Sequence, residues 1–106
     1  MSDCIFCKVA KGELPSKTLY QDNQTMVIAD INPQASVHWL VMPKEHVEQF
    51  SKAGEEMINH LMKIIKQVIA DEKIVSYRIV NNGKGAALID HMHFHILGKV
   101  DKFRKL

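Results

Sequence analysis

The sequence predicts a single α+β domain over residues 1–106, with an antiparallel sheet of about five strands, one short helix and one long helix. Three observations indicate this class. Apolar residues alternate with histidines over 91–97, apolar residues recur at three- and four-residue spacing over 51–70, and the other connections are brief. Brief connections join antiparallel neighbours, because a parallel crossover needs a dozen or more residues.

The first part of the chain is expected to contain the short helix and three strands. Asp3 is a suitable N-cap for a helix over 4–11, which Gly12 would end. Residues 30–34 read as a loop, because the residue before a proline is disfavoured in helical geometry. Residues of high strand propensity lie between turn signals and define three strands, over 19–21, 25–29 and 37–42.

The second part contains the long helix, predicted over 51–70, and two further strands. We interpret its apolar stripe as core or subunit interface, and it comprises Met57, Ile58, Leu61, Met62, Ile65, Val68 and Ile69. His60 falls between these positions and is expected to be partly exposed. After a break at 71–73, a strand, a glycine-containing loop and the histidine strand follow, over 75–80, 81–87 and 91–97.

Composition excludes several classes of protein. The formal net charge is +2 with neutral histidines, which is far from the basic excess of a nucleic-acid-binding domain. No apolar run approaches the length of a membrane span, and Asp3 and Lys8 interrupt any signal peptide, so we expect a cytoplasmic protein without membrane or nucleic-acid partners. We interpret the basic tail as solvated, and it carries Lys99, Lys102, Arg104 and Lys105.

The histidine strand is the stretch that indicates function. Side chains of a strand alternate between two faces, so His91, His93 and His95 share one face. The intervening apolar residues would face the core, and they are Met92, Phe94 and Ile96. A row of titratable rings is a poor choice for packing alone, since burial removes polar groups from water. The row therefore indicates chemistry or metal binding rather than a purely structural face.

Two chemistries suit this row. An imidazole is a good nucleophile toward phosphorus when an acceptor holds its far nitrogen, and flanking rings can contact phosphoryl oxygens or transfer a proton. The loop that contains Asn81 could present backbone N–H groups to the phosphate. The alternative is a catalytic zinc ion held by the histidines themselves. Against this alternative, the sequence near the row offers no carboxylate pattern that would support such rings except Asp90.

Cys4 and Cys7 suggest a second site. A disulfide is not expected in a reducing cytosol, and thioredoxin-like redox chemistry would require a preceding strand. Three residues apart on a helix, the two thiols share one face and could supply two ligands to a structural zinc ion. His46 and His91 are the candidates to complete the tetrahedron, with a pair of buried thiols as the alternative.

The sequence resembles the histidine triad family, which is defined by a His-x-His-x-His motif followed by apolar residues, here His91 to Leu97. The resemblance runs from Cys4 to about Lys99. It also includes the segments Asp30 to Ala35 and Pro43 to His46, together with His38. These motifs resemble the Hint-like branch of nucleoside phosphoramidases. The resemblance implies a homodimer, in which the sheet continues across the two-fold interface.

The resemblance also implies a role for each matching residue. His93 would be the nucleophile, His95 and His38 would contact the phosphate and leaving group, and the His91 carbonyl would orient His93. Asp30 would bind the ribose hydroxyls and Asn81 the phosphate. The purine pocket would be lined by Ile5, Phe6, Val9, Leu14, Ile31 and Leu40. Bacterial relatives bind zinc at positions that match Cys4, Cys7, His46 and His91.

The chain departs from the family pattern just before the triad. Relatives usually have a glycine, an amide and a hydroxyl side chain here, whereas this chain has Ala86, Ala87, Leu88 and Ile89. Ala87 and Leu88 can still offer backbone N–H groups to the nucleotide. The loss of one side-chain hydrogen bond would cost about 1–3 kcal/mol of transition-state stabilisation.

These observations predict a hydrolase or transferase that cleaves at the α-phosphorus of a purine nucleoside monophosphate derivative, such as a phosphoramidate. The reaction would pass through a nucleotidyl-histidine intermediate without a catalytic cofactor, while a structural zinc ion is possible. Two alternatives stay open. One is a purine-nucleotide binding or sensing protein with weak or no catalysis, and the other is a zinc-dependent hydrolase that uses the triad as ligands.

Overall fold

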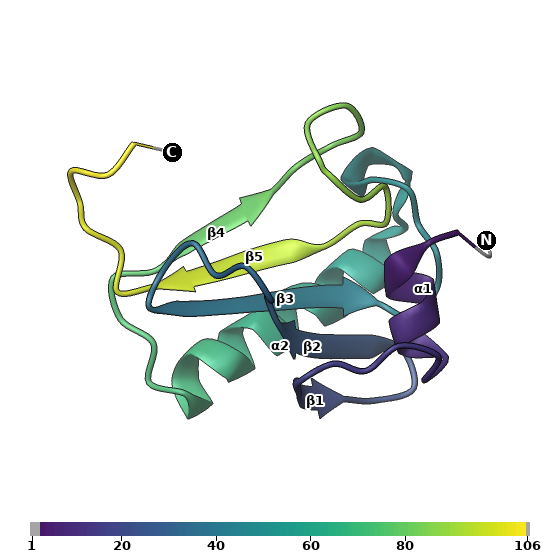
Figure 1. Ribbon diagram of the computed structural model, residues 1–106, viewed down its shortest axis with the longest axis horizontal. Coiled ribbons are helices and arrows are strands. Elements are labelled where there is room, and N and C mark those ends of the chain that lie inside the picture. Colours follow the sequence, from purple (N-terminus) through teal and green to yellow (C-terminus); the bar gives the residue numbers. More distant parts are fainter. Residues whose placement is uncertain (1–2, 106) are drawn as a thin grey trace.

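The sheet has five strands, as predicted, and every neighbouring pair is antiparallel (Figure 1). The computed structural model describes residues 3–105. The spatial order of the strands is β1-β2-β3-β5-β4. Their bounds are β1 Thr18–Gln21, β2 Thr25–Ala29, β3 Val37–Pro43, β4 Arg78–Asn81 and β5 Phe94–Gly98. The helices are α1 Ile5–Ala10 and α2 Glu55–Asp71, with a 3-10 turn over Phe50–Lys52.

One helix packs against each face of the sheet. Figure 1 shows α2 crossing behind the sheet and α1 lying in front of one end. Side chains alternate between the two faces of each strand, so the core has two parts. Val27, Val41 and Ile96 pack with α2 on one side. The residues between them pack with α1 on the other side, and they are Met26, Ile28, Leu40 and Met42. The candidate site lies on the α1 side.

Helix α2 buries the predicted apolar stripe. Leu61, Ile65 and Val68 are buried, as is Ile64, which the sequence analysis omitted from the stripe. The helix begins at Glu55 rather than at residue 51, because Ala53 and Gly54 adopt extended backbone conformations before it. Among residues 3–105, no helix is long and apolar enough to cross a bilayer.

Two predicted strands have different bounds. The strand expected over 75–80 begins only at Arg78, because Lys73 and Ser76 adopt positive φ angles of 52° and 51°. Such angles interrupt extended geometry and leave Val75 exposed. The histidine strand begins at Phe94 rather than at residue 91, and the Met92 N–H instead donates to the Val47 carbonyl at 2.7 Å.

The predicted alternation nevertheless continues through this irregular entry to β5. Met92, Phe94 and Ile96 all belong to the core beneath α2. Leu40 pairs directly with His95, and opposed residues of an antiparallel pair point to the same face. The side chain of His95 therefore lies on the α1 side of the sheet.

A polar contact joins α2 to the turn between β1 and β2. The His60 ring and the Asp22 carboxylate lie 2.9 Å apart, and the His60 side chain is 31% exposed, as the helical pattern suggested. Burial alone would raise the pKa of Asp22. Hydrogen bonds from the Gln24 N–H, His60, Tyr20 and the Thr25 N–H outweigh burial and lower this pKa to about 2.

We expect Asp22→Ala to reduce the free energy of unfolding by about 2 kcal/mol at pH 7, because several donors lose a charged acceptor. Since the pKa of Asp22 falls on folding, its contribution is full above the unfolded value of 3.8 and is lost as the pH falls toward about 2. Urea unfolding at pH 7 and pH 3 would measure both effects. Glu13→Ala is the exposed control, and equal stability of the two variants would contradict this assignment.

Candidate functional site

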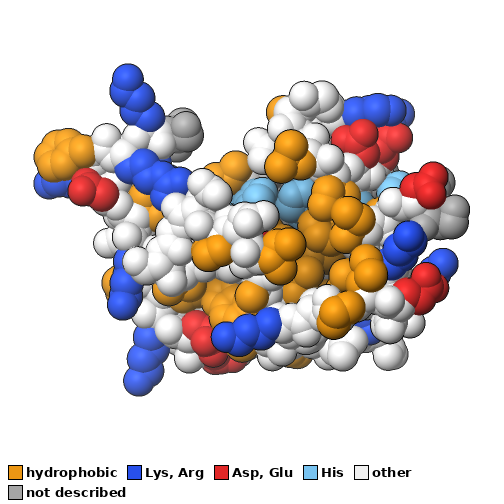
Figure 2. Space-filling model, in the orientation of Figure 1, with side chains coloured by type: hydrophobic (Ala, Val, Ile, Leu, Met, Phe, Trp, Pro, Cys, Tyr) orange, Lys and Arg blue, Asp and Glu red, His pale blue; other side chains and the backbone are white. Residues whose placement is uncertain are grey.

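A cavity of about 480 Å³ opens on the α1 side of the sheet. Figure 2 shows histidine surface in a hollow that hydrophobic side chains surround. The residues predicted for the site that line this cavity are Ile5, Phe6, Val9, Leu14, Asp30, Ile31, Leu40, Leu88, His93 and His95. The structure thus brings most of the predicted set together. Leu88 and Ile31 are almost fully exposed, at 103% and 91% of their reference areas, so much of the rim is apolar.

Four residues predicted for the catalytic or nucleotide site lie outside the cavity lining, and they are His38, His91, Asn81 and Ala87. Asn82 and Ala86 line the cavity, whereas their neighbours Asn81 and Ala87 do not. Asn81 belongs to β4, and its side-chain amide donates to the His93 carbonyl at 2.9 Å. Asn81 therefore holds the backbone of His93, and its contact with a phosphate stays a prediction.

The cavity also includes residues that the sequence analysis missed. They are Pro15, Ser16, Ile28, Ala29, Asn32, Asn82, Ala86 and Ile89. Only Ile28 carried a usable signal, because Ile28 pairs directly with Leu40 across β2 and β3 and so shares its face. The others lie on loops or at strand ends, where side-chain direction has no simple period.

His93 is buried, and its orientation is determined by the backbone. Its Nδ1 lies 2.8 Å from the His91 carbonyl oxygen, which can only accept a hydrogen bond. In the neutral ring, Nδ1 therefore carries the proton and Nε2 has the lone pair. The ring of Phe6 packs edge-on with its centroid 5.0 Å from that of His93. This combination holds an unprotonated nitrogen at the wall of the cavity.

His38 and His95 form a second oriented pair. The Gln34 N–H donates to Nδ1 of His38 at 3.0 Å, so the proton of the neutral His38 ring must be on Nε2. Nε2 of His38 donates to Nδ1 of His95 at 2.8 Å. It also lies 3.4 Å from the Asp30 carboxylate. His95 consequently carries its own proton on Nε2, the ring nitrogen that is left to meet a ligand.

Electrostatics favour the neutral form of both rings. Burial lowers the pKa of His38, with the Asp30 carboxylate opposing and Arg104 reinforcing the effect. Burial also lowers the pKa of His95 to about 4, and the neighbouring His93 and His38 act in the same direction. Near pH 7 both rings are therefore uncharged, as their hydrogen bonds require.

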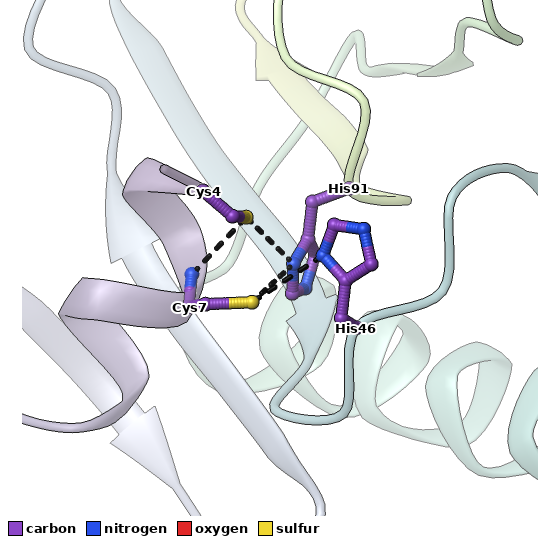
Figure 3. A group of neighbouring side chains, drawn as sticks. All are labelled: Cys4, Cys7, His46 and His91. Atoms are coloured by element: carbon purple, nitrogen blue, oxygen red, sulfur yellow. Dashed lines mark hydrogen bonds between the residues drawn. The ribbon is translucent and has the colours of Figure 1, made fainter. Parts of the chain in front are cut away.

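His91 points away from the cavity, toward the two cysteines. Its Nε2 donates to the Pro43 carbonyl at 2.8 Å, which leaves the lone pair of Nδ1 3.3 Å from the Cys4 sulfur and 3.5 Å from the Cys7 sulfur. Nδ1 of His46 lies 3.3 Å from the Cys7 sulfur. Figure 3 shows the thiols of Cys4, which caps α1, and Cys7, within α1, facing the two imidazoles.

These four side chains suit a tetrahedral zinc ion. Their ligand atoms all lie within 4.8 Å of one another, and two thiols with two imidazoles are a common zinc donor set. The Cys7 N–H donates to the Cys4 sulfur at 3.3 Å. Burial raises the pKa of the Cys7 thiol, and a bound cation would favour its deprotonated form.

The triad is therefore divided between two clusters. His91 lies with the cysteines and His46, whereas His95 lies with His38 and Asp30, whose ligand atoms are also within 4.8 Å of one another. Because the rings of His91 and His95 belong to different clusters, this arrangement does not support the three triad histidines as ligands of one metal ion.

Comparison with known protein families identifies the chain. The model of the HIT domain matches residues 11–102, which is most of the sequence. The chain belongs to the HIT domain family. Its five-stranded antiparallel sheet with two helices is the fold of solved HIT proteins.

Three relatives illustrate the similarity of this HIT-domain protein to others. An uncharacterised HIT-like protein of Methanocaldococcus jannaschii is 37% identical, over 94% of this chain and 86% of the relative. A HIT family hydrolase from Clostridium thermocellum is 37% identical with a TM-score of 0.89, and the match covers 100% of this chain and 98% of that one. A histidine triad nucleotide-binding protein from Candida albicans is 28% identical with a TM-score of 0.84, over 93% and 76% of the two chains.

We expect the His95 ring to titrate with a pKa of about 4, well below the ordinary value of 6.5. Asp30→Asn should lower it further, because the Asp30 carboxylate favours the charged ring. Ring-carbon NMR shifts recorded against pH would measure both values. His60→Ala is the control for losing a remote titratable group and should leave the His95 titration unchanged. A His95 pKa near 6.5 would contradict the assignment of a buried neutral ring.

Proposed function

We propose that this HIT-domain protein hydrolyses, or transfers the nucleotidyl group of, purine nucleoside monophosphate derivatives of the phosphoramidate type. One observation carries the proposal: His93 presents an unprotonated Nε2 to a cavity of about 480 Å³, with its other nitrogen hydrogen-bonded to a carbonyl. Volumes of 300–1,000 Å³ are typical of small-molecule sites. The similarity to a HIT family hydrolase and to a histidine triad nucleotide-binding protein supports it.

The cavity has suitable groups for each part of such a substrate. The apolar side chains of Ile5, Phe6 and Leu40 would pack against the purine, and the Asp30 carboxylate would accept hydrogen bonds from the ribose hydroxyls. The Nε2–H of His95 would donate to a phosphoryl oxygen. Because His95 is neutral, it contributes a directed hydrogen bond rather than a charge.

The first step would be attack of His93 Nε2 on the α-phosphorus. The nitrogen lone pair forms a new N–P bond, while the P–N bond to the amine breaks and the departing amine keeps the electron pair and takes up a proton. The positive charge that develops on His93 is stabilised by the His91 carbonyl at Nδ1. Water would then attack the same phosphorus, releasing the nucleoside monophosphate and regenerating the His93 lone pair.

The loop before the triad favours one alternative, a nucleotide-binding protein with weak catalysis. Ala86 and Leu88 line the cavity, and neither side chain can donate a hydrogen bond to a phosphoryl oxygen. A substrate phosphate would depend on the His95 ring and on backbone N–H groups. Binding of AMP without turnover would favour this alternative.

The homodimer also belongs to the proposal. Strand β4 is at the edge of the sheet, and its described pairing is with β5 alone. Ile79 in this strand and Tyr77 just before it are both exposed large hydrophobic residues. Pairing of two β4 edges across a two-fold axis would extend the sheet and cover them.

We expect His93→Ala to lower the turnover of adenosine 5′-phosphoramidate by roughly 10³-fold or more, because the covalent route is lost. AMP affinity should change little, since the base and ribose contacts stay. Release of AMP and calorimetric binding would measure the two effects, with His60→Ala as a control that keeps full activity. Unchanged turnover in His93→Ala would remove the nucleophile assignment. Loss of wild-type turnover in a strong chelator would favour the metal-dependent alternative.

A structural zinc ion at Cys4, Cys7, His46 and His91 is a second part of the proposal. Bound there, zinc would supply a cross-link between α1 and the segment before β5, with no role as a reacting group. It would hold His91, whose carbonyl orients His93. A cytoplasmic location would keep both thiols reduced and available to the metal.

We expect the protein to bind one zinc ion per chain, and Cys7→Ser and His46→Ala each to weaken this binding by roughly 100-fold. Competition with a chromogenic chelator would measure affinity. Cobalt substitution should give the intense thiolate-to-metal absorption of a cysteine-ligated site in the wild type, weakened in Cys7→Ser. His60→Ala should bind zinc as the wild type does. Equal zinc affinity in all four proteins would contradict the site.

A further inference from the structure

The C-terminal tail contacts the loop that precedes β3. The guanidinium of Arg104 donates to the carbonyl of Gln34, seventy residues away in the sequence. The contact is possible because Gly98, the last residue of β5, pairs with Val37, the first residue of β3 (Figure 1). The tail therefore leaves the sheet beside the loop. The sequence predicted that the basic tail is solvated. Arg104 departs from this prediction, because its guanidinium contacts the loop.

The loop over 30–36 has little other support from outside. Its Asn32 N–H donates to the Asp30 carboxylate, the Gln34 amide donates to the Asn32 carbonyl, and the Asp30 N–H donates to the His38 carbonyl. Among the hydrogen bonds between described residues, the one from Arg104 is the only one that reaches this loop from outside residues 30–38. Arg104 is thus the described hydrogen-bond partner that joins Gln34 to a distant segment of the chain.

Gln34 connects Arg104 with the cavity histidines. Its carbonyl accepts from Arg104, and its N–H donates to Nδ1 of His38. His38 in turn donates from Nε2 to Nδ1 of His95. We propose that Arg104 is a positioning residue, which holds Gln34 against His38 and thereby selects the His95 tautomer that donates a hydrogen bond to the substrate phosphate.

The tautomer matters because the ligand is anionic. With the Gln34 N–H in place, His38 must carry its proton on Nε2, and His95 presents Nε2–H to the phosphate. If the Gln34 N–H moves away, His38 can hold its proton on Nδ1 and accept through Nε2 from His95. His95 would then present a lone pair to the phosphoryl oxygens, which repel it.

Arg104 also affects the charge of the His38 ring. The groups that face the His38 ring are the Asp30 carboxylate, the His95 ring and the Arg104 guanidinium. Burial and Arg104 lower the pKa of His38, whereas Asp30 raises it. Loss of the guanidinium should therefore raise the pKa of His38, and protonated His38 cannot accept from the Gln34 N–H. Protonated His38 still donates from Nε2 to His95, so the tautomer effect of Arg104 is a property of the neutral His38 ring.

The inference rests on the proposed function, and binding of AMP and adenosine tests it. We expect Arg104→Ala to weaken AMP binding roughly tenfold, the effect of one hydrogen bond to a charged group, and adenosine binding by less than about twofold. Arg104→Lys should restore part of the AMP affinity. Lys102→Ala is the matched control, because it removes one positive charge from the same exposed tail without touching Gln34.

Ring-nitrogen NMR without nucleotide gives a second readout. Wild-type His95 should be protonated at Nε2, and Arg104→Ala should shift part of the population to Nδ1. Equal loss of AMP and adenosine affinity, no loss of either, or an equal effect of Lys102→Ala would overturn the inference. If the wild type binds neither ligand, the proposed function fails. The positioning role is tested independently by the NMR measurement, and an unchanged His95 tautomer in Arg104→Ala would overturn it.

Discussion

Backbone groups assign the proton on each buried imidazole, and the chemistry of the site depends on this constraint. The carbonyls of Pro43 and His91 each accept from one ring nitrogen, which leaves a lone pair on His91 Nδ1 and His93 Nε2. The Gln34 N–H has the opposite effect on His38, because it requires a lone pair at Nδ1. Buried rings without such partners would pay a desolvation cost and have no fixed direction.

The constraint explains how one short segment serves two sites. His91 and His93 are two residues apart, yet one lone pair faces the thiols of α1 and the other the cavity. The His91 peptide joins the two sites, because its ring belongs to the cysteine cluster while its carbonyl orients His93. The irregular backbone before Phe94 permits this arrangement, since regular strand geometry would place both rings on one surface in the same direction.

The spacing of apolar residues correctly predicted which side chains of β5 and α2 are buried. The alternation of Met92, Phe94 and Ile96 indicated the core side of β5, and the spacing in α2 indicated its buried stripe. The start of β4 could not be predicted in this way, because Lys73 and Ser76 have positive φ angles that neither residue type signals.

Contacts between segments that are distant in the chain could not be predicted from the sequence. The resemblance gave Asn81 a role at the phosphate, but it did not indicate that the Asn81 amide donates to the His93 carbonyl. Composition described a basic tail but not which carbonyl lies beside Arg104. The tautomers of His38 and His95 likewise depend on the position of a loop, which no residue pattern specifies.

Neutron crystallography of the deuterium-exchanged protein at neutral pH would test the central claim most directly, because it locates the exchangeable proton on each ring. We expect deuterium on Nδ1 of His93 and on Nε2 of both His38 and His91, with Nε2 of His93 bare. Deuterium on Nε2 of His93 would contradict the account, since that ring would then have no lone pair with which to attack phosphorus.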